Sequence, residues 1–218
     1  KDKKDKKEKK EKKEKKEKEE SDSDAESEDS DAGKGTKKKS DEDLEFDDEE
    51  VKDVINIMKT MVEEKKASTP DKFMEELRMH QLAKCFDHKV RLYVGLEVLC
   101  GTGMDGKAVS DKAKFLSKLI EAGRMEGADV LCSFGMFIEV NKTATKGYAM
   151  VLKAIYDEDW AEEAQILKYY DEDEGERDPG FAAAKQAAAP FLKWLATADE
   201  DDDDDDDEDD SDEDDSDD

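Results

Sequence analysis

Aromatic and acidic residues interleave near the end of the sequence, between residues 154 and 200. Carboxylates attract the ammonium groups of lysine, and aromatic rings pack on lysine stems or hold the cation over their faces. Each such contact contributes about 0.5–1 kcal/mol at an exposed site, so several must act together. The pattern therefore predicts a surface that binds lysine-rich segments of another protein. We expect this surface to contain Asp157, Asp159, Trp160, Glu162, Glu163, Tyr169, Asp171, Trp194, Asp199 and Glu200.

Two alternatives stay open for these residues. The tryptophan rings could equally be core residues of the last helices, since large aromatic side chains are often buried. The carboxylates could serve solubility alone, as charged surface residues commonly do. The sequence by itself does not choose between these interpretations and the lysine-binding surface.

The rest of the sequence offers little for catalysis. The chain has only two histidines, His80 and His88, and its many carboxylates lie in charged stretches where their pKa values would not be tuned for proton transfer. The three cysteines, Cys85, Cys100 and Cys132, match no metal-binding spacing, and we expect them to be reduced core thiols. We therefore predict no enzymatic activity, no catalytic residue, no cofactor and no metal site.

Residues 101–106, GTGMDG, match the glycine pattern of a dinucleotide-binding loop. That pattern carries weight only after a strand and inside a βαβ unit. Here no βαβ alternation surrounds it, and Glu121, about twenty residues further on, lies in an amphipathic helical pattern. We predict a turn between helices. The alternative, an enzyme that binds a nucleotide here, would be detected by calorimetry.

Charge is distributed very unevenly along the chain, whose net charge is −28. Residues 1–20 contain 12 lysines and 8 acidic residues, whereas residues 199–218 contain 18 acidic residues and no basic one. These flanks lack the apolar side chains that offset the entropy of ordering a chain. We predict a disordered linker at 1–46, lysine-rich and then acidic, one folded domain at 47–198, and a disordered acidic tail at 199–218. The net charge disfavours direct nucleic-acid binding and favours a basic protein partner.

Apolar residues recur at helical spacing through the folded domain, and no long segment alternates as a half-buried strand does. The first helix is expected from about residue 47, and a second after Thr69, a good N-cap, with Pro70 at its first position. About eight helices with short joints indicate an all-α, HEAT-like α-solenoid. No apolar run is long enough to span a membrane. The later helices are expected at about 87–100, 107–122, 126–141, 143–156, 159–170 and 180–197.

The stretches YDEDWAEEAQILKYYDEDE and APFLKWLATADE resemble the two aromatic- and acid-rich boxes that close the W2-type HEAT domain of translation initiation factors. The resemblance covers about residues 47–200, and Ala161 and Ala164 depart from the bulkier residues usual in the first box. A lysine-rich linker before the domain and an acidic tail after it resemble the initiation factor 5 family. They fit less well the other candidate, the epsilon subunit of initiation factor 2B. By position, Trp160, Glu162 and Glu163 match the first box, and Trp194, Asp199 and Glu200 match the second.

This resemblance implies a cytoplasmic protein-binding platform. Such a domain engages lysine blocks of the initiation factor 2 beta subunit, contacts initiation factors 1 and 3, and assembles the pre-initiation complex on the small ribosomal subunit. Together with the linker it slows GDP release from initiation factor 2. The GTPase-activating function of that family belongs to a separate N-terminal domain, which this sequence does not contain. The chain opens in mid-repeat without Met, and we expect it to be the C-terminal part of a longer protein.

Three further expectations concern the charged flanks. Residues 1–20 form a tethered lysine-rich peptide that could occupy the acidic surface, so their deletion should tighten partner binding. Phosphorylation of Ser211 or Ser216 would add negative charge to the tail and strengthen binding. The rival hypothesis is an acidic histone- or chaperone-binding protein in which the tail at 199–218 does the binding.

Overall fold

A computed structural model of the protein describes residues 45–198. Within this part of the chain the structure contains nine α-helices, one 3-10 helix and no strand, which confirms the all-α prediction. The expectations for residues 1–44 of the linker predicted at 1–46, for the tail at 199–218 and for Asp199, Glu200, Ser211 and Ser216 lie outside the described residues. Of the last two linker residues, Phe46 is half-buried and packs edge-on against Tyr93, with ring centroids 5.7 Å apart. The helices are α2 (Glu49–Glu63), α3 (Pro70–Lys84), α4 (His88–Leu99), α5 (Gly106–Asp111), α6 (Ala113–Gly123), α7 (Gly127–Val140), η2 (Lys142–Gly147), α8 (Tyr148–Asp157), α9 (Glu163–Tyr170) and α10 (Phe181–Ala198).

Capping residues set several helix boundaries, and the cap at Thr69 is the one that the sequence predicts. The Thr69 hydroxyl accepts a hydrogen bond from the backbone N–H of Lys72 at 3.4 Å, with Pro70 at the first helical position of α3. The Asp87 side chain accepts from the backbone N–H of Val90 at 2.8 Å and begins α4. These side chains satisfy donors that would otherwise lack partners at helix starts.

Three local features differ from the prediction. The helix expected at 107–122 is split into α5 and α6 at Lys112, and the segment expected to be helical from 143 begins as the 3-10 helix η2. The helix expected from 159 begins only at Glu163, because Asp159 adopts a left-handed backbone with φ 58° and ends α8. On α3, Leu82 is 65% exposed.

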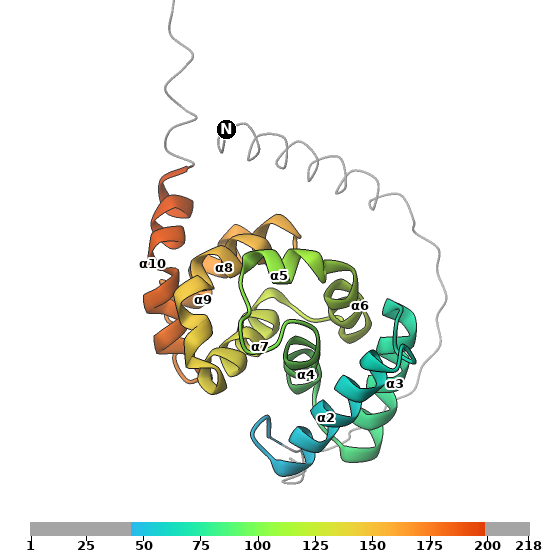
Figure 1. Ribbon diagram of the computed structural model, residues 1–218. Helices are drawn as coiled ribbons and strands as arrows, with labels where there is room; N and C mark the ends of the chain where they lie inside the picture. The colour runs from blue at the N-terminus through green and yellow to red at the C-terminus, as the bar shows by residue number, and fades with distance from the viewer. Residues whose placement is uncertain (1–44, 199–218) are drawn as a thin grey trace, which may run out of the picture. The chain divides into compact units, whose positions relative to one another are not determined.

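The helices pack in layers around a central pair. Figure 1 shows α4 and α7 in the middle, with α2 and α3 on one side and α8, α9 and α10 on the other. Both central helices are apolar around most of their circumference, as expected of helices covered on several faces. Every residue from 90 to 97 in α4 and from 130 to 138 in α7 is buried.

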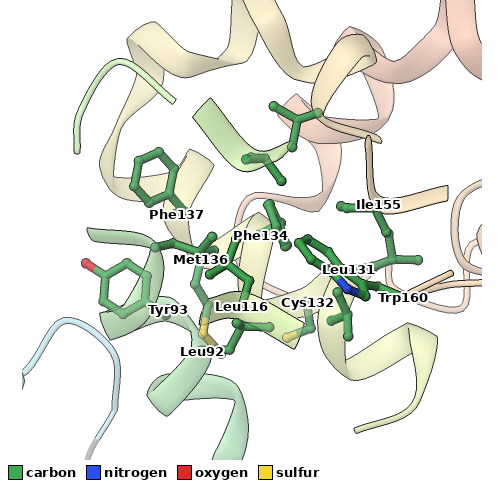
Figure 2. Packing of buried hydrophobic residues seen from close by; sticks show 14 of the residues in the cluster. Leu92, Tyr93, Leu116, Leu131, Cys132, Phe134, Met136, Phe137, Ile155 and Trp160 are labelled. Atoms are coloured by element: carbon green, nitrogen blue, oxygen red, sulfur yellow. The ribbon is translucent and has the colours of Figure 1, made fainter. Parts of the chain in front are cut away.

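Figure 2 shows the side chains at the centre of this core, including Leu92 of α4, Leu116 of α6 and Phe134 of α7. Trp160, from the connection between α8 and α9, packs in the same cluster. The C-terminal helices therefore share one continuous core with the N-terminal ones. This arrangement gives the acidic segments between α8 and α10 a rigid support.

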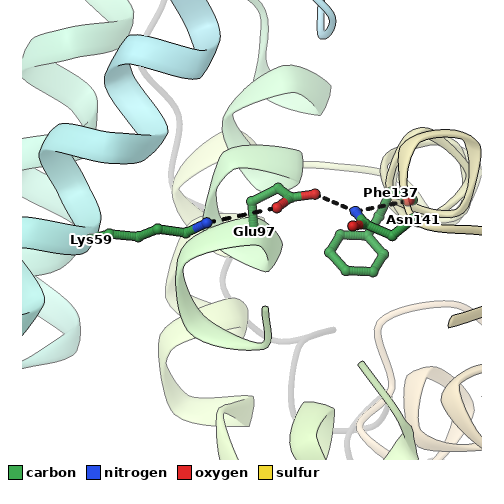
Figure 3. A network of polar contacts seen from close by, with 4 residues as sticks. All are labelled: Lys59, Glu97, Phe137 and Asn141. Carbon is green, nitrogen blue, oxygen red and sulfur yellow. Dashed lines mark hydrogen bonds and ion pairs between the residues drawn. The ribbon is translucent and has the colours of Figure 1, made fainter. Parts of the chain in front are cut away.

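A polar network crosses the stack beside this core (Figure 3). Glu97 of α4 is only 6% exposed, and its carboxylate accepts a hydrogen bond from the Asn141 side-chain amide at the end of α7. The Lys59 ammonium of α2 lies 4.0 Å from the same carboxylate. Asn141 also donates to the Phe137 carbonyl at 3.3 Å. A buried carboxylate requires such partners, and this one links three helices.

Candidate functional site

The connection between α8 and α9 begins with a Schellman motif. The backbone N–H of Asp159 donates to the Tyr156 carbonyl at 3.2 Å, and that of Trp160 donates to the Ile155 carbonyl at 3.1 Å. Asp159 takes the left-handed conformation that this motif requires. The motif reverses the chain, so that Asp157 and Asp159 stay exposed while Trp160 enters the core.

Trp160 and Tyr169 are core residues. The Trp160 indole is 7% exposed, donates from Nε1 to the Ser117 hydroxyl at 2.9 Å and packs on Phe134 with ring centroids 6.5 Å apart. Tyr169 is 2% exposed and donates its hydroxyl hydrogen to Asp178 at 2.9 Å. Both rings pack below the acidic segments. For Trp160 this agrees with the alternative, left open by the sequence, that the tryptophan rings are core residues.

Two other rings lie partly at the surface and pack on a third, Phe191, which is buried. Tyr156 of α8 and Trp194 of α10 are half-buried, with ring centroids 6.4 Å apart, and Phe191 lies 6.1 Å from Tyr156 and 5.4 Å from Trp194. We call these three residues the aromatic cluster. It adjoins Asp157, the next residue after Tyr156. An exposed carboxylate therefore lies one residue along the chain from this cluster, and acidic and aromatic groups together suit a lysine side chain.

Carboxylates from the first predicted box surround the start of α9. Glu162 is exposed and forms the N-cap, and its backbone N–H donates a hydrogen bond to Gln165 Oε1 at 2.9 Å. Glu163 is half-buried in the first turn. Negative side chains at a helix start are stabilised by the helix dipole, so the fold tolerates their clustering here.

A second acidic group follows the end of α9. Asp171, Glu172, Asp173 and Glu174 are all exposed, and Asp173 has φ 59°, which turns the chain toward α10. We call these four residues, together with Asp157, Asp159, Glu162 and Glu163, the acidic surface. The two groups lie at opposite ends of α9, which as an eight-residue helix spans about 12 Å.

Some of these carboxylates are paired with lysines of the same domain. The distance from the lysine Nζ to a carboxylate oxygen is 2.7 Å for Lys153 and Asp157, 2.6 Å for Lys185 and Asp173, and 3.0 Å for Lys168 and Glu174. Exposed ion pairs of this kind contribute about 0.2–1 kcal/mol. A lysine of a partner can therefore replace the internal lysine at little cost. The i,i+4 spacing of Lys153 and Asp157 is a signal that the sequence contained, whereas the other two pairs depend on the turn after α9.

The departure at Ala161 has a packing explanation. A Cβ atom on Gly127, at the start of α7, would lie 3.0 Å from the Ala161 Cβ and 2.5 Å from the Gln165 Oε1. Ala161 is 2% exposed, so the starts of α7 and α9 approach closely at this point. A bulky residue at 161 would not fit. Ala164 is exposed, and this contact does not explain why position 164 also has a small residue.

The GTGMDG segment is a turn between helices. It follows α4 rather than a strand, Gly101 has φ 65°, and the Asp105 side chain caps α5 by accepting from the Ala108 N–H at 2.8 Å. A Cβ on Gly106 would lie 2.5 Å from the Met150 carbonyl oxygen, so this glycine permits close packing of α5 on α8. Turn geometry explains Gly101 and close packing explains Gly106, whereas nothing in the structure requires a glycine at Gly103.

The cysteines differ in their exposure. Cys85, expected in the core, is exposed, Cys100 is half-buried and Cys132 is buried. Burial raises the pKa of the Cys100 and Cys132 thiols to about 12. Within residues 45–198 no group of His, Cys, Asp and Glu side chains has the arrangement of a metal site. No helix in the same range is both long and apolar enough to cross a membrane.

Comparison with known proteins gives one family match. Residues 126–205 match the sequence model of the W2 family, described as eIF4-gamma/eIF5/eIF2-epsilon. The match begins at the N-cap of α7 and includes α8, α9, α10 and both acidic boxes. No curated protein and no solved structure gives a significant match. Residues 126–205 of this chain are therefore similar to the W2 family, and the similarity is shown for this part of the chain.

Proposed function

We propose that this chain is a protein-binding platform of translation initiation that docks lysine-rich segments on its acidic surface. The observation that carries the proposal is the aromatic cluster on α8 and α10, in which the half-buried Tyr156 and Trp194 reach the surface near Asp157, within the matched W2 region. An aromatic surface bordered by carboxylates fits lysine stems and ammonium groups together. We propose the lysine blocks of the initiation factor 2 beta subunit as the main partner.

Binding on such a surface would proceed by exchange of ion pairs. The negative field of the acidic surface steers a lysine-rich segment toward it, which raises the association rate and weakens with salt. The incoming ammonium groups then displace Lys153, Lys168 and Lys185 from their exposed carboxylates. The aromatic cluster takes up the apolar stems. No single contact is strong, so the affinity depends on several lysines in one segment.

The wider role follows the W2 family resemblance and belongs to the same proposal. The platform would also contact initiation factors 1 and 3 and so assemble the pre-initiation complex in the cytoplasm. With residues 1–46 it would slow GDP release from initiation factor 2. The chain would act through binding and not through catalysis of its own. We place this chain nearer to the initiation factor 5 family than to the epsilon subunit of initiation factor 2B.

The test uses a fluorescent lysine-block peptide and the full chain. We expect the double charge reversal Glu162→Lys and Glu163→Lys to weaken binding about tenfold or more. The matched control is Glu75→Lys with Glu76→Lys on α3, a neighbouring pair with the same combination of one exposed and one half-buried glutamate. Equal weakening in both double variants would show that net charge alone governs binding and would contradict the proposal.

A tail deletion separates this proposal from its rival. Removal of residues 199–218 should reduce binding only in part, and the remainder should still require Trp194. Complete loss of binding on deletion of the tail would instead favour an acidic histone- or chaperone-binding protein. The affinity of the intact chain should fall strongly between low and moderate salt.

A further inference from the structure

A pocket of about 470 Å³ opens between α3 and the start of α4. Figure 1 shows α3 on the opposite side of the helical stack from α10, so this pocket is distinct from the acidic surface. Its lining is cationic and apolar, in contrast to the acidic surface. Among the residues that line it are Arg78, Gln81, Leu82, Phe86, His88 and Arg91.

Arg91 is the central residue of the pocket. It is only 2% exposed, and its guanidinium donates from one terminal nitrogen to Gln81 Oε1 at 3.0 Å and from the other to the Leu119 carbonyl at 2.8 Å. Its Nε is buried and has no hydrogen-bond partner within residues 45–198. Both partners of this buried cation are neutral. A buried charge normally has a carboxylate or another counter-ion. Here the guanidinium charge has no counter-ion among these partners, and its Nε–H donor has no acceptor in the described part of the chain.

The other polar groups of the pocket do not supply the missing anion. Arg78, on the same helix as Gln81, adds a second guanidinium. Burial lowers the pKa of Arg91, and the nearby charge of Arg78 lowers it further. Among the described residues that line the pocket, Asp87 alone carries a carboxylate, and its Oδ1 caps α4 by accepting from the Val90 N–H at 2.8 Å. The Gln81 amide nitrogen is committed to the Phe86 carbonyl at 2.9 Å. A chain of net charge −28 thus has a local site with excess positive charge.

An exposed apolar patch borders the cationic part. Leu82 lines the pocket and is 65% exposed, and Met79, three residues earlier on α3, is 62% exposed. Residues three apart on a helix lie on neighbouring positions of one face. Exposed apolar side chains next to a pocket indicate a binding partner that carries apolar groups as well as charge. A simple inorganic anion would leave these side chains unused.

We propose that this pocket binds an acidic peptide segment of a partner protein, with a carboxylate on the exposed Arg78 and an adjacent apolar side chain on Leu82. The buried and uncompensated charge of Arg91 would attract the same carboxylate without direct contact. The arrangement gives the domain two binding sites of opposite preference, one for lysine-rich and one for acidic-apolar segments. The proposal does not depend on the lysine-binding role of the acidic surface.

Fluorescence anisotropy with a labelled peptide in which Glu and Leu alternate tests this proposal on the full chain. We expect saturable binding that Arg78→Glu weakens about tenfold or more and that Leu82→Ser weakens several-fold. The matched control is Arg177→Glu, an exposed arginine in the turn before α10, which makes the same change in net charge and should leave binding intact. Arg91→Lys tests the central residue, with its folding checked by circular dichroism. If Arg91→Lys does not fold, the Arg78 and Leu82 variants carry the test.

Three outcomes would overturn the proposal. Equal binding of a peptide with Gln in place of every Glu would show that no carboxylate is recognised. Equal binding of a polyaspartate peptide, or displacement of the peptide by inorganic phosphate at comparable concentration, would show that the apolar rim does not contribute. Equal weakening by Arg78→Glu and Arg177→Glu would show that only overall charge matters.

Discussion

Removal of one hydroxyl group from the buried Tyr148–Tyr170 pair should destabilise the domain, whereas removal of both should not. Tyr148 begins α8 and Tyr170 ends α9, and their hydroxyl oxygens lie 2.6 Å apart. Both side chains are fully buried, and burial raises the pKa of each phenol. The Tyr170 ring also stacks on Phe181 of α10, with centroids 5.7 Å apart. The pair therefore joins the helices that carry the acidic surface.

The expected magnitude follows from the burial of the two hydroxyls. In Tyr148→Phe or Tyr170→Phe the remaining hydroxyl is left in the core without its partner, which costs about 1–3 kcal/mol. For a domain of this size each kcal/mol lowers the melting temperature by about 2–4 °C. In the double variant both rings keep their shape and no unpaired hydroxyl remains. Its free energy of unfolding should lie within about 1 kcal/mol of that of the parent chain.

The assay is urea denaturation followed by far-UV circular dichroism, applied to the parent chain, both single variants and the double variant. The double variant serves as the internal control, because it removes the same atoms as the two single variants together. If its loss of stability equalled the sum of the two single losses, the hydroxyls would not be coupled. The explanation from an unsatisfied buried partner would then be refuted.

Three other predictions concern thiol reactivity, the pH dependence of stability and the replacement of a glycine. Under native conditions at about pH 8 a thiol reagent should modify Cys85 quickly, whereas Cys100 and Cys132, whose pKa values burial raises to about 12, should react only on unfolding. Because the unfolded chain ionises these thiols first, the free energy of unfolding should fall as the pH rises from about 8.5 towards 12, and a flat profile would contradict this. Gly180→Ala should cost more than about 1 kcal/mol by thermal denaturation, since φ is 71° and the new Cβ would lie 2.1 Å from a backbone carbonyl oxygen. The control Gly103→Ala, where a Cβ meets nothing within 4 Å, should cost less, and equal losses would count against the steric explanation.

Local signals in the sequence located most helices, because apolar periodicity and capping act over a few residues. Thr69 and Pro70 begin α3 as predicted. The start of α9 was predicted too early because Asp159, a non-glycine residue, takes a left-handed conformation. Asp159 takes the left-handed position of a Schellman motif, and Trp160, the next residue, packs against Ser117 and Phe134, which lie far away in the sequence.

The sequence indicated that aromatic and acidic residues gather near the C-terminus, but it could not say which rings are exposed. Trp160 and Tyr169 are buried, whereas Tyr156 and Trp194 meet at the surface. That difference depends on how α8 and α10 pack, since both kinds of ring have acidic neighbours in the sequence. The pocket around Arg91 gave no sequence signal, because its residues come from three helices and the turn between α3 and α4.

The most direct test of the lysine-binding surface is an NMR titration of the isotope-labelled chain with a lysine-block peptide. The account predicts that the backbone amide signals that shift will cluster in residues 156–174 and in the second half of α10, around Trp194. The signals of α2 and α3 should stay in place, and added salt should reverse the shifts. Shifts confined to residues 199–218, or centred on α2 and α3, would contradict the central claim that the ordered acidic surface receives the partner.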